Sequence, residues 1–260
     1  MNQVCDSPPV TAEDLRRCPA CDAPFTAYVR DVPTRRTNRL IPLYACLDCR
    51  SFWNPSGYRE TDAQLKKDVD WGVSVEERNR AASARLFDHL EQRGVEISSV
   101  AEIGCGIGTL LNVARERGYR AVGFDVNRHA ADYATKVGKL DVRSEFWSAE
   151  TALPPIDLFL CISVLEHLDQ PRPLIENLCR AALRNRAALF ISVPFLDRPK
   201  WEFVLDPEPT RQGTPFFDND VHVVHFSTPG LLSAMESFGL RDIEEVRYGL
   251  WHGLLAKPLR

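Results

Sequence analysis

Three glycines that alternate with other residues behind an acidic side chain carry the clearest chemical signal, in the stretch Glu102-Ile-Gly104-Cys-Gly106-Ile-Gly108. An apolar segment, 97–100, precedes this stretch, and a helical pattern, 110–117, follows it. A strand that enters a glycine turn and opens a helix presents bare backbone amides at a helix N-terminus. The pattern therefore predicts a nucleotide-like cofactor. The glycine spacing differs from the dinucleotide fingerprint G-x-G-x-x-G, which disfavours NAD.

Further polar residues follow the apolar segments that come after this turn. Asp125 ends the segment 120–124, and an acid about 20 residues beyond a glycine turn is placed to accept hydrogen bonds from ribose hydroxyls. The segments 156–163 and 187–194 have the composition of buried strands. Strands that alternate with helices predict a mostly parallel sheet with helices on both faces.

Together with Val164-Leu-Glu166-His167-Leu-Asp-Gln-Pro171, these motifs resemble the class I S-adenosylmethionine-dependent methyltransferases over residues 98–260. The resemblance implies a Rossmann-like α/β fold with a seven-stranded sheet of order 3-2-1-4-5-7-6, in which the last strand is antiparallel. It also implies S-adenosylmethionine (SAM) as cofactor. The cofactor-binding residues that it implies are Glu102, Gly104, Cys105, Gly106, Gly108, Asp125, Val126, Ser148, Ala149, Ile162 and Ser163.

The residues expected beside the adenine depart from the family pattern. Related enzymes usually have an acid where this chain has Ser148, so the serine hydroxyl or Glu150 would meet the adenine amino group. Trp147 either stacks on the base or packs in the core.

Three histidines and one glutamate are candidates for catalysis: His167, His222, His225 and Glu166. An acceptor with an acidic proton benefits from a general base, and the ordinary pKa of histidine suits that role. On an extended segment, side chains 222 and 225 face opposite sides, so only one of them is expected to point into the site. Sugar C-methyltransferases with an N-terminal zinc module look similar here, and His222 matches a histidine of their motif, although valines replace its neighbours.

Two C-x-x-C pairs, Cys18/Cys21 and Cys46/Cys49, predict a structural zinc site. Two such knuckles can complete a tetrahedral shell of four thiolates, and the segments 25–30 and 40–45 provide a hairpin between them. The other thiols have no partner spacing; we interpret Cys161 and Cys179 as small buried residues and Cys105 as a turn residue.

Length and composition bound the organisation of the chain. Its 260 residues fit one sizeable α/β domain plus a small module, and its net charge of −4 provides no global attraction for nucleic acid. We expect a tail at 1–15, a zinc-binding module at 16–58, a helical linker at 59–97 and a methyltransferase domain at 98–260. The proline- and aromatic-rich segment 197–217 is expected to cover the substrate. Without a signal-peptide pattern or a long apolar run, a cytoplasmic location with no membrane contact is expected.

The leading hypothesis is methyl transfer to a small-molecule acceptor: a sugar, a glycan or a secondary-metabolite intermediate. The first alternative is rRNA or tRNA methylation, because an rRNA methyltransferase family also joins a zinc ribbon to this fold. The acidic overall charge disfavours that alternative. A second alternative is a non-catalytic zinc scaffold.

Overall fold

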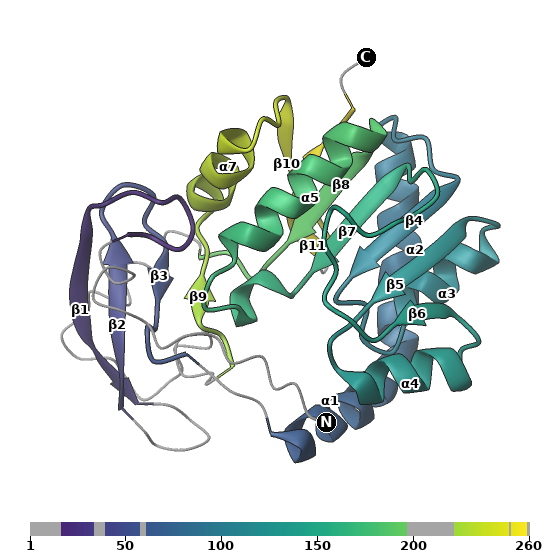
Figure 1. Ribbon diagram of the computed structural model, residues 1–260, viewed down its shortest axis with the longest axis horizontal. Coiled ribbons are helices and arrows are strands. Elements are labelled where there is room, and N and C mark those ends of the chain that lie inside the picture. Colours follow the sequence, from purple (N-terminus) through teal and green to yellow (C-terminus); the bar gives the residue numbers. More distant parts are fainter. Residues whose placement is uncertain (1–16, 34–39, 58–60, 197–220, 250, 259–260) are drawn as a thin grey trace.

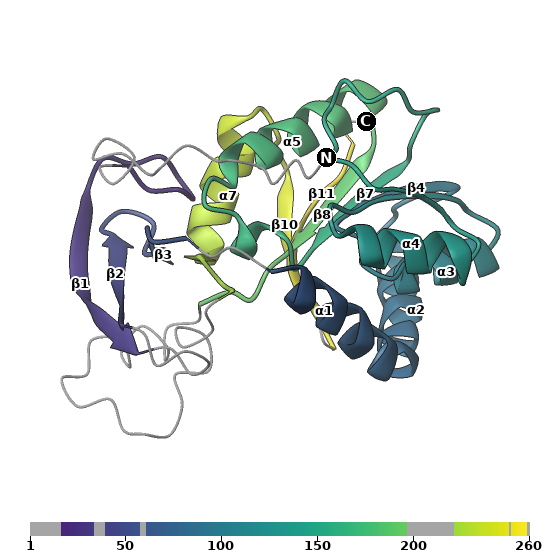
Figure 2. The ribbon, with the colours of Figure 1, turned by 60° about the horizontal axis from the view of Figure 1, so that its bottom comes forward.

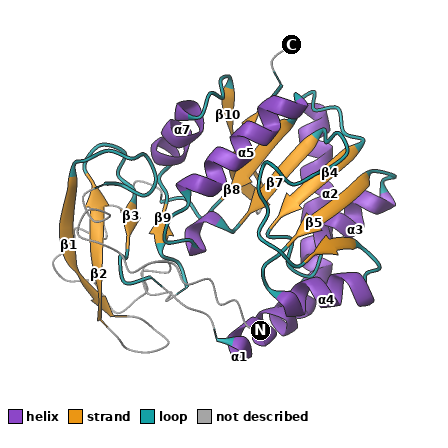
Figure 3. Cartoon of the chain, in the orientation of Figure 1, coloured by secondary structure: helices purple, strands orange, loops and turns teal. Residues whose placement is uncertain are grey.

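The protein is described from a computed structural model, which covers residues 17–33, 40–57, 61–196, 221–249 and 251–258. Two sheets lie side by side, a small one at the N-terminal side and a large one flanked by helices (Figures 1 and 3). The expected tail at 1–15 and the expected covering segment at 197–217 lie outside the described residues. None of the helices in the described ranges is long and apolar enough to cross a membrane.

The large sheet has seven strands: β4 (Ser99–Ile103), β5 (Arg120–Phe124), β6 (Asp141–Arg143), β7 (Leu158–Ile162), β8 (Ala188–Ser192), β10 (Ile243–Tyr248) and β11 (Trp251–Ala256). Their spatial order is β10-β11-β8-β7-β4-β5-β6. The five strands from β4 to β8 pair in parallel, and β11 inserts antiparallel between β8 and β10. The predicted order 3-2-1-4-5-7-6 and the antiparallel last strand are confirmed.

Alternation along the strands divides the core into two layers. In β7, Leu158 and Leu160 pack with α2 (Glu76–Gln92) and α3 (Thr109–Glu116), whereas Phe159 and Cys161 pack with α5 (Arg172–Asn185) and α7 (Thr228–Ser237). Strand side chains point alternately to opposite faces, so a continuous apolar run is buried on both sides. The helices therefore cover both faces of the sheet (Figure 2).

Three further helices border the carboxyl ends of the strands: α1 (Asp62–Ser74), α4 (Arg128–Lys136) and the 3₁₀ turn η2 (Leu165–His167). The predicted helical linker is two helices, separated at Val75. Helix α1 has no buried residue. Several of its side chains line a pocket instead of packing in the core.

The small sheet has the order β1-β2-β3-β9. The hairpin β1 (Thr26–Pro33) and β2 (Leu40–Cys46) confirms the expectation for segments 25–30 and 40–45. The short strand β3 (Phe52–Trp53) adds to this hairpin, and β9 (Val224–His225) pairs antiparallel with β3. The sheet of the N-terminal module is therefore completed by β9, a strand about 170 residues later in the chain. This strand lies within the region 98–260, which was predicted as the methyltransferase domain.

Candidate active site

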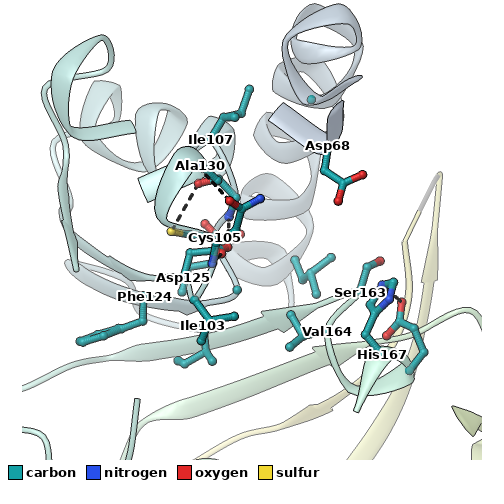
Figure 4. Close-up of a pocket in the computed structure, with 18 of the residues that line it drawn as sticks. Asp68, Ile103, Cys105, Ile107, Phe124, Asp125, Ala130, Ser163, Val164 and His167 are labelled. Atoms are coloured by element: carbon teal, nitrogen blue, oxygen red, sulfur yellow. Dashed lines mark hydrogen bonds and ion pairs between the residues drawn. The ribbon is translucent and has the colours of Figure 1, made fainter. Parts of the chain in front are cut away.

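A pocket of about 1370 Å³ lies at the carboxyl ends of β4, β5 and β7. Ligands of open α/β sheets bind at this edge, where the glycine turn and the strand-end residues converge. Figure 4 shows Cys105 and Asp125 at one part of the pocket and Ser163, Val164 and His167 at another, with Asp68 reaching in from α1. One site thus combines the predicted cofactor motifs with the predicted catalytic motif.

The three glycines of the turn have different roles, although all have a positive φ. A Cβ atom on Gly104 would lie 2.2 Å from Val164 Cγ2, and one on Gly108 would lie 2.3 Å from Leu140 Cδ1. A Cβ on Gly106 would meet nothing within 4 Å. Gly104 and Gly106 line the pocket, whereas Gly108 begins α3 outside the lining. Gly106 is therefore the glycine that leaves open space for a ligand.

Two buried acids flank this turn. Burial and the nearby Asp125 charge raise the pKa of Glu102 well above its ordinary value, and Glu102 Oε2 accepts no hydrogen bond from the described residues. Asp125 accepts 2.7 Å hydrogen bonds from the amides of Gly106 and Asn127. Burial raises the Asp125 pKa, and these two amides oppose that rise. A carboxylate oxygen has two lone pairs, so Asp125 can still accept from ribose hydroxyls while its position is fixed.

The residues expected beside the adenine lie at and next to one edge of the pocket. Trp147 and its two predecessors, Glu145 and Phe146, line the pocket, whereas Ser148 and Ala149 do not. The Ser148 amide donates to Thr151 Oγ1 over 3.3 Å, and the Ala149 amide donates to Asn177 Oδ1 over 3.4 Å.

Two of the residues expected here have other partners. Glu150 lies 3.2 Å from the guanidinium groups of Arg180 and Arg184, outside the pocket lining. The Trp147 ring packs near Phe124 and Phe159, as the core interpretation predicted, and one part of its side chain still faces the pocket.

The remaining predicted cofactor residues, Cys105, Val126, Ile162 and Ser163, all line the pocket. Ser163 has a left-handed backbone with φ of 54°, which is uncommon for a residue other than glycine. Its amide donates to Ser192 O over 2.9 Å, so sheet contacts hold this conformation. Strained backbone persists where the surroundings over-determine it, and such residues cluster at functional sites.

Glu166, His167 and His222 form a cluster beside this strand end. Their ligand atoms lie within 4.8 Å of one another, and the two imidazole centroids are 5.0 Å apart. Burial raises the pKa of Glu166 to about 8, and neither of its carboxylate oxygens has a hydrogen-bond partner among the described residues. His167 Nδ1 donates to Val221 O over 3.0 Å. Burial and the neighbouring His167 lower the pKa of His222 to about 4, so His222 is neutral at pH 7.

The third candidate, His225, does not line the pocket. Its side chain is buried, its ring centroid is 6.3 Å from that of His222, and burial lowers its pKa to about 3. His222 lines the pocket and His225 lies in β9, which agrees with the expectation that only one of them points inward.

Several lining residues were not anticipated from the sequence. Asp68 and Trp71 come from α1, Arg78 and Asn79 come from α2, and Trp251 begins β11. No motif in the sequence marks these positions. Helix α1 has no buried residue, so its apolar and charged side chains are available to line the pocket.

The four cysteines of the C-x-x-C pairs converge at the edge of the small sheet. The sulfurs of Cys18 and Cys49 are 3.6 Å apart, and those of Cys21 and Cys46 are 3.7 Å apart. Zinc–thiolate bonds of 2.3 Å in a tetrahedron place sulfurs about 3.8 Å apart. The arrangement therefore fits a four-thiolate zinc shell.

The other described thiols are apart from this cluster. Cys105, Cys161 and Cys179 are buried, and burial raises the pKa of each, that of Cys179 to about 12. These values agree with the interpretation of all three as unreactive packing or turn residues.

Comparison with known proteins agrees with this geometry. The chain is 26% identical over 169 residues to a ubiquinone biosynthesis O-methyltransferase of Histophilus somni, covering 60% of this chain and 63% of that protein. It is 28% identical over 119 residues to the enzyme of the same name from Actinobacillus pleuropneumoniae, covering 41% of this chain and 50% of that protein. The chain thus spans only about half to three fifths of these relatives.

Solved structures share the fold at low sequence identity. Human N-acetylserotonin methyltransferase, solved with SAM, has a TM-score of 0.56 at 17% identity, covering 76% of this chain and 56% of that one. A SAM-dependent methyltransferase from Archaeoglobus fulgidus has a TM-score of 0.51 at 18% identity, covering 72% and 99%. A family model described as a methyltransferase domain matches residues 74–245. The resemblance noted from the motifs is confirmed, and the chain belongs to this methyltransferase family.

Proposed function

We propose that this protein transfers the methyl group of SAM to a small-molecule acceptor at the pocket where the glycine turn meets the Glu166–His167–His222 cluster. One observation carries the proposal: the pocket that is open over Gly106 is also lined by the two buried acids and by the Glu166–His167–His222 cluster. The family supports the transferred group, and the small-molecule names of the relatives support the class of acceptor.

The residues around the turn fit SAM. Gly104 and Gly106 would let the amino-acid part approach the backbone, and Glu102 would hold its ammonium group. Asp125 would accept hydrogen bonds from the ribose hydroxyls. When bound, SAM supplies an activated methyl on a sulfonium, and transfer is an in-line displacement. The main task of the chain is therefore to align the acceptor and exclude water.

The acceptor-side cluster supplies the proton chemistry. His222 is unprotonated at pH 7 because burial lowers its pKa to about 4, so its imidazole can accept a proton from an acceptor hydroxyl, as a weaker base than an ordinary histidine. Glu166 lies beside it without a hydrogen-bond partner among the described residues, and its raised pKa of about 8 leaves the carboxyl largely protonated at pH 7, so it is placed to donate a hydrogen bond and orient groups at this site. His167 is oriented by its bond to Val221 O. We assign the general base to His222 and exclude His225, which does not reach the pocket.

The cysteine cluster has a separate, structural role in this proposal. Four thiolates fill the coordination shell of a tetrahedral zinc ion, so no position is open for substrate. We infer that zinc stabilises the small module.

The first test is calorimetric titration of the protein with SAM. The wild type is expected to bind with micromolar affinity, and Asp125→Ala is expected to bind roughly 10- to 150-fold more weakly, since a hydrogen bond to a charged group contributes about 1.5–3 kcal/mol. Asp132→Ala, which removes an exposed acid paired with Lys136, is the control and is expected to bind like the wild type.

Acceptor classes are then compared with SAM that carries a labelled methyl group. Transfer to phenols or nucleotide sugars supports the proposal, whereas transfer to tRNA or rRNA fragments replaces it with RNA methylation. A folded, zinc-loaded wild type that binds no SAM would leave the scaffold hypothesis in its place.

A further inference from the structure

The segment 221–227, here called the strap, joins the two sheets at the pocket. His222 lines the pocket, Val224 and His225 form β9, and Ser227 caps α7. From Val223 to Ser227 every side chain is buried. In Figure 1 the strap lies between the small sheet and α5, with β9 labelled on it.

One side of the strap is hydrogen-bonded to η2, the turn that carries Glu166 and His167. The Val223 amide donates to Glu166 O over 2.7 Å, and Val221 O accepts from His167 Nδ1 over 3.0 Å. These two bonds surround His222 in the sequence. The position of His222 relative to Glu166 and His167 is thus set by backbone bonds of the strap.

The other side of the strap is bonded to the cysteine module. Val223 O accepts from the Asn54 amide over 2.8 Å, and β9 pairs with Phe52 and Trp53 of β3. Val223 therefore joins the two sides: its amide donates to Glu166 O, and its carbonyl accepts from Asn54 of the module.

A pair of serines fixes the end of the strap against one of the cysteines. Ser51 Oγ accepts from the Ser227 amide over 3.0 Å and lies 3.2 Å from Cys49 Sγ, and Ser227 Oγ donates to Cys49 O. Both serines are buried. We call this pair the serine latch.

The latch leaves no room for adjustment. A Cβ atom on Gly230, in the first turn of α7, would lie 2.4 Å from Ser51 Oγ and 3.0 Å from Cys49 Sγ. When one partner of a buried hydrogen bond is removed, the other is left without water or a replacement partner, which costs free energy. Each hydrogen bond of the latch is therefore a constraint on the strap.

We propose that the cysteine module is the positioning element of the acceptor side of the pocket, and that Ser51 and Ser227 are positioning residues that hold His222 beside Glu166 and His167. This inference rests on the proposed function for the role of His222. It assigns to the module an intramolecular task in methyl transfer, in addition to its own stability.

The test uses the full chain with its metal, in the variants Ser51→Ala and Ser227→Ala. Ser237→Ala is the matched control, because Ser237 also bonds through its hydroxyl, at the opposite end of α7. Removal of a cysteine is avoided because it would unfold the module.

Two readouts separate positioning from general destabilisation. Amide hydrogen exchange of residues 222–226 is expected to accelerate at least about tenfold in both alanine variants, because the strap amides then open locally, and to stay unchanged in Ser237→Ala. In NMR titrations, the His222 imidazole pKa is expected to rise from about 4 toward its ordinary value as its burial is relaxed. Zinc content and SAM affinity are expected to stay within twofold of the wild type.

The proposal is overturned if both alanine variants retain zinc and leave strap exchange and the His222 titration unchanged. It is also overturned if SAM affinity falls as much as strap protection, since the loosening would then be global. Neither readout requires turnover. A wild type that fails to bind SAM therefore refutes the proposed function and leaves the strap measurement intact.

Discussion

At the scale of single residues, the two acids beside the glycine turn show how binding chemistry costs stability. Glu102 is buried with one oxygen that no described residue satisfies, and burial and the nearby Asp125 raise its pKa, so folding favours the protonated form. A ligand ammonium would supply the missing partner and favour the charged form. The site is therefore strained electrostatically without its ligand.

This strain predicts a pH-dependent effect of Glu102→Gln. Above pH 4.5 the unfolded chain releases the Glu102 proton and the folded chain retains it, so wild-type stability falls by up to about 1.4 kcal/mol per pH unit until the folded pKa is reached. Glutamine does not titrate. The difference in thermal midpoint, variant minus wild type, is expected to increase from pH 5 to pH 8. The variant is also expected to bind SAM more weakly than the wild type.

Both quantities are measurable by scanning and titration calorimetry of the two proteins in the same buffers. A difference in midpoint that stays constant with pH would contradict the assignment of a raised pKa to Glu102.

At the scale of elements, the glycine turn separates binding from folding. Gly106 faces open space, whereas Gly108 faces Leu140 across the start of α3. Gly106→Ala is expected to cost only the left-handed backbone penalty of about 1 kcal/mol and to weaken SAM binding at least tenfold. Gly108→Ala is expected to lose more stability, because the new methyl group overlaps Leu140, with a smaller direct effect on binding.

Urea unfolding and calorimetric titration of both variants check this pair of outcomes. Equal losses of affinity in the two variants, once each is measured well below its unfolding midpoint, would show that the glycines act together on the ligand.

The same elements show what could be predicted from sequence. Strands β4, β5, β7 and β8 are short apolar runs between turn signals, so local pattern was sufficient to find them. The order of the sheet came from family resemblance, because no local pattern encodes it. Strand β9 has two residues and pairs with β3 far away in the sequence, so neither periodicity nor motif could reveal it. The adenine contacts expected at Ser148 and Ala149 stay a prediction; the pocket lining includes their neighbours Glu145, Phe146 and Trp147, which no motif marks.

At the scale of the whole molecule, the pairing of β9 with β3 couples the small sheet to the large domain. The module of four cysteines has only a small apolar cluster of its own, made of Val32, Ile41, Leu43, Ala45 and Phe52 with Leu196 from the larger part, while its Ala20 and Trp53 are buried in the core cluster shared with the large domain. A core this small rarely supplies enough stability alone. We therefore expect the module to depend on the proposed zinc ion and on the large domain, to which the strap joins it.

This dependence predicts a single cooperative thermal transition for the zinc-loaded protein. Removal of the metal with a chelator is expected to lower the midpoint of that one transition by several degrees rather than to produce a separate early transition, because β3 and β9 unfold together. Differential scanning calorimetry with and without the chelator, monitored also by tryptophan fluorescence, measures both midpoints. Two well-separated transitions in the zinc-loaded protein would mean that the strap pairing does not couple the module to the pocket.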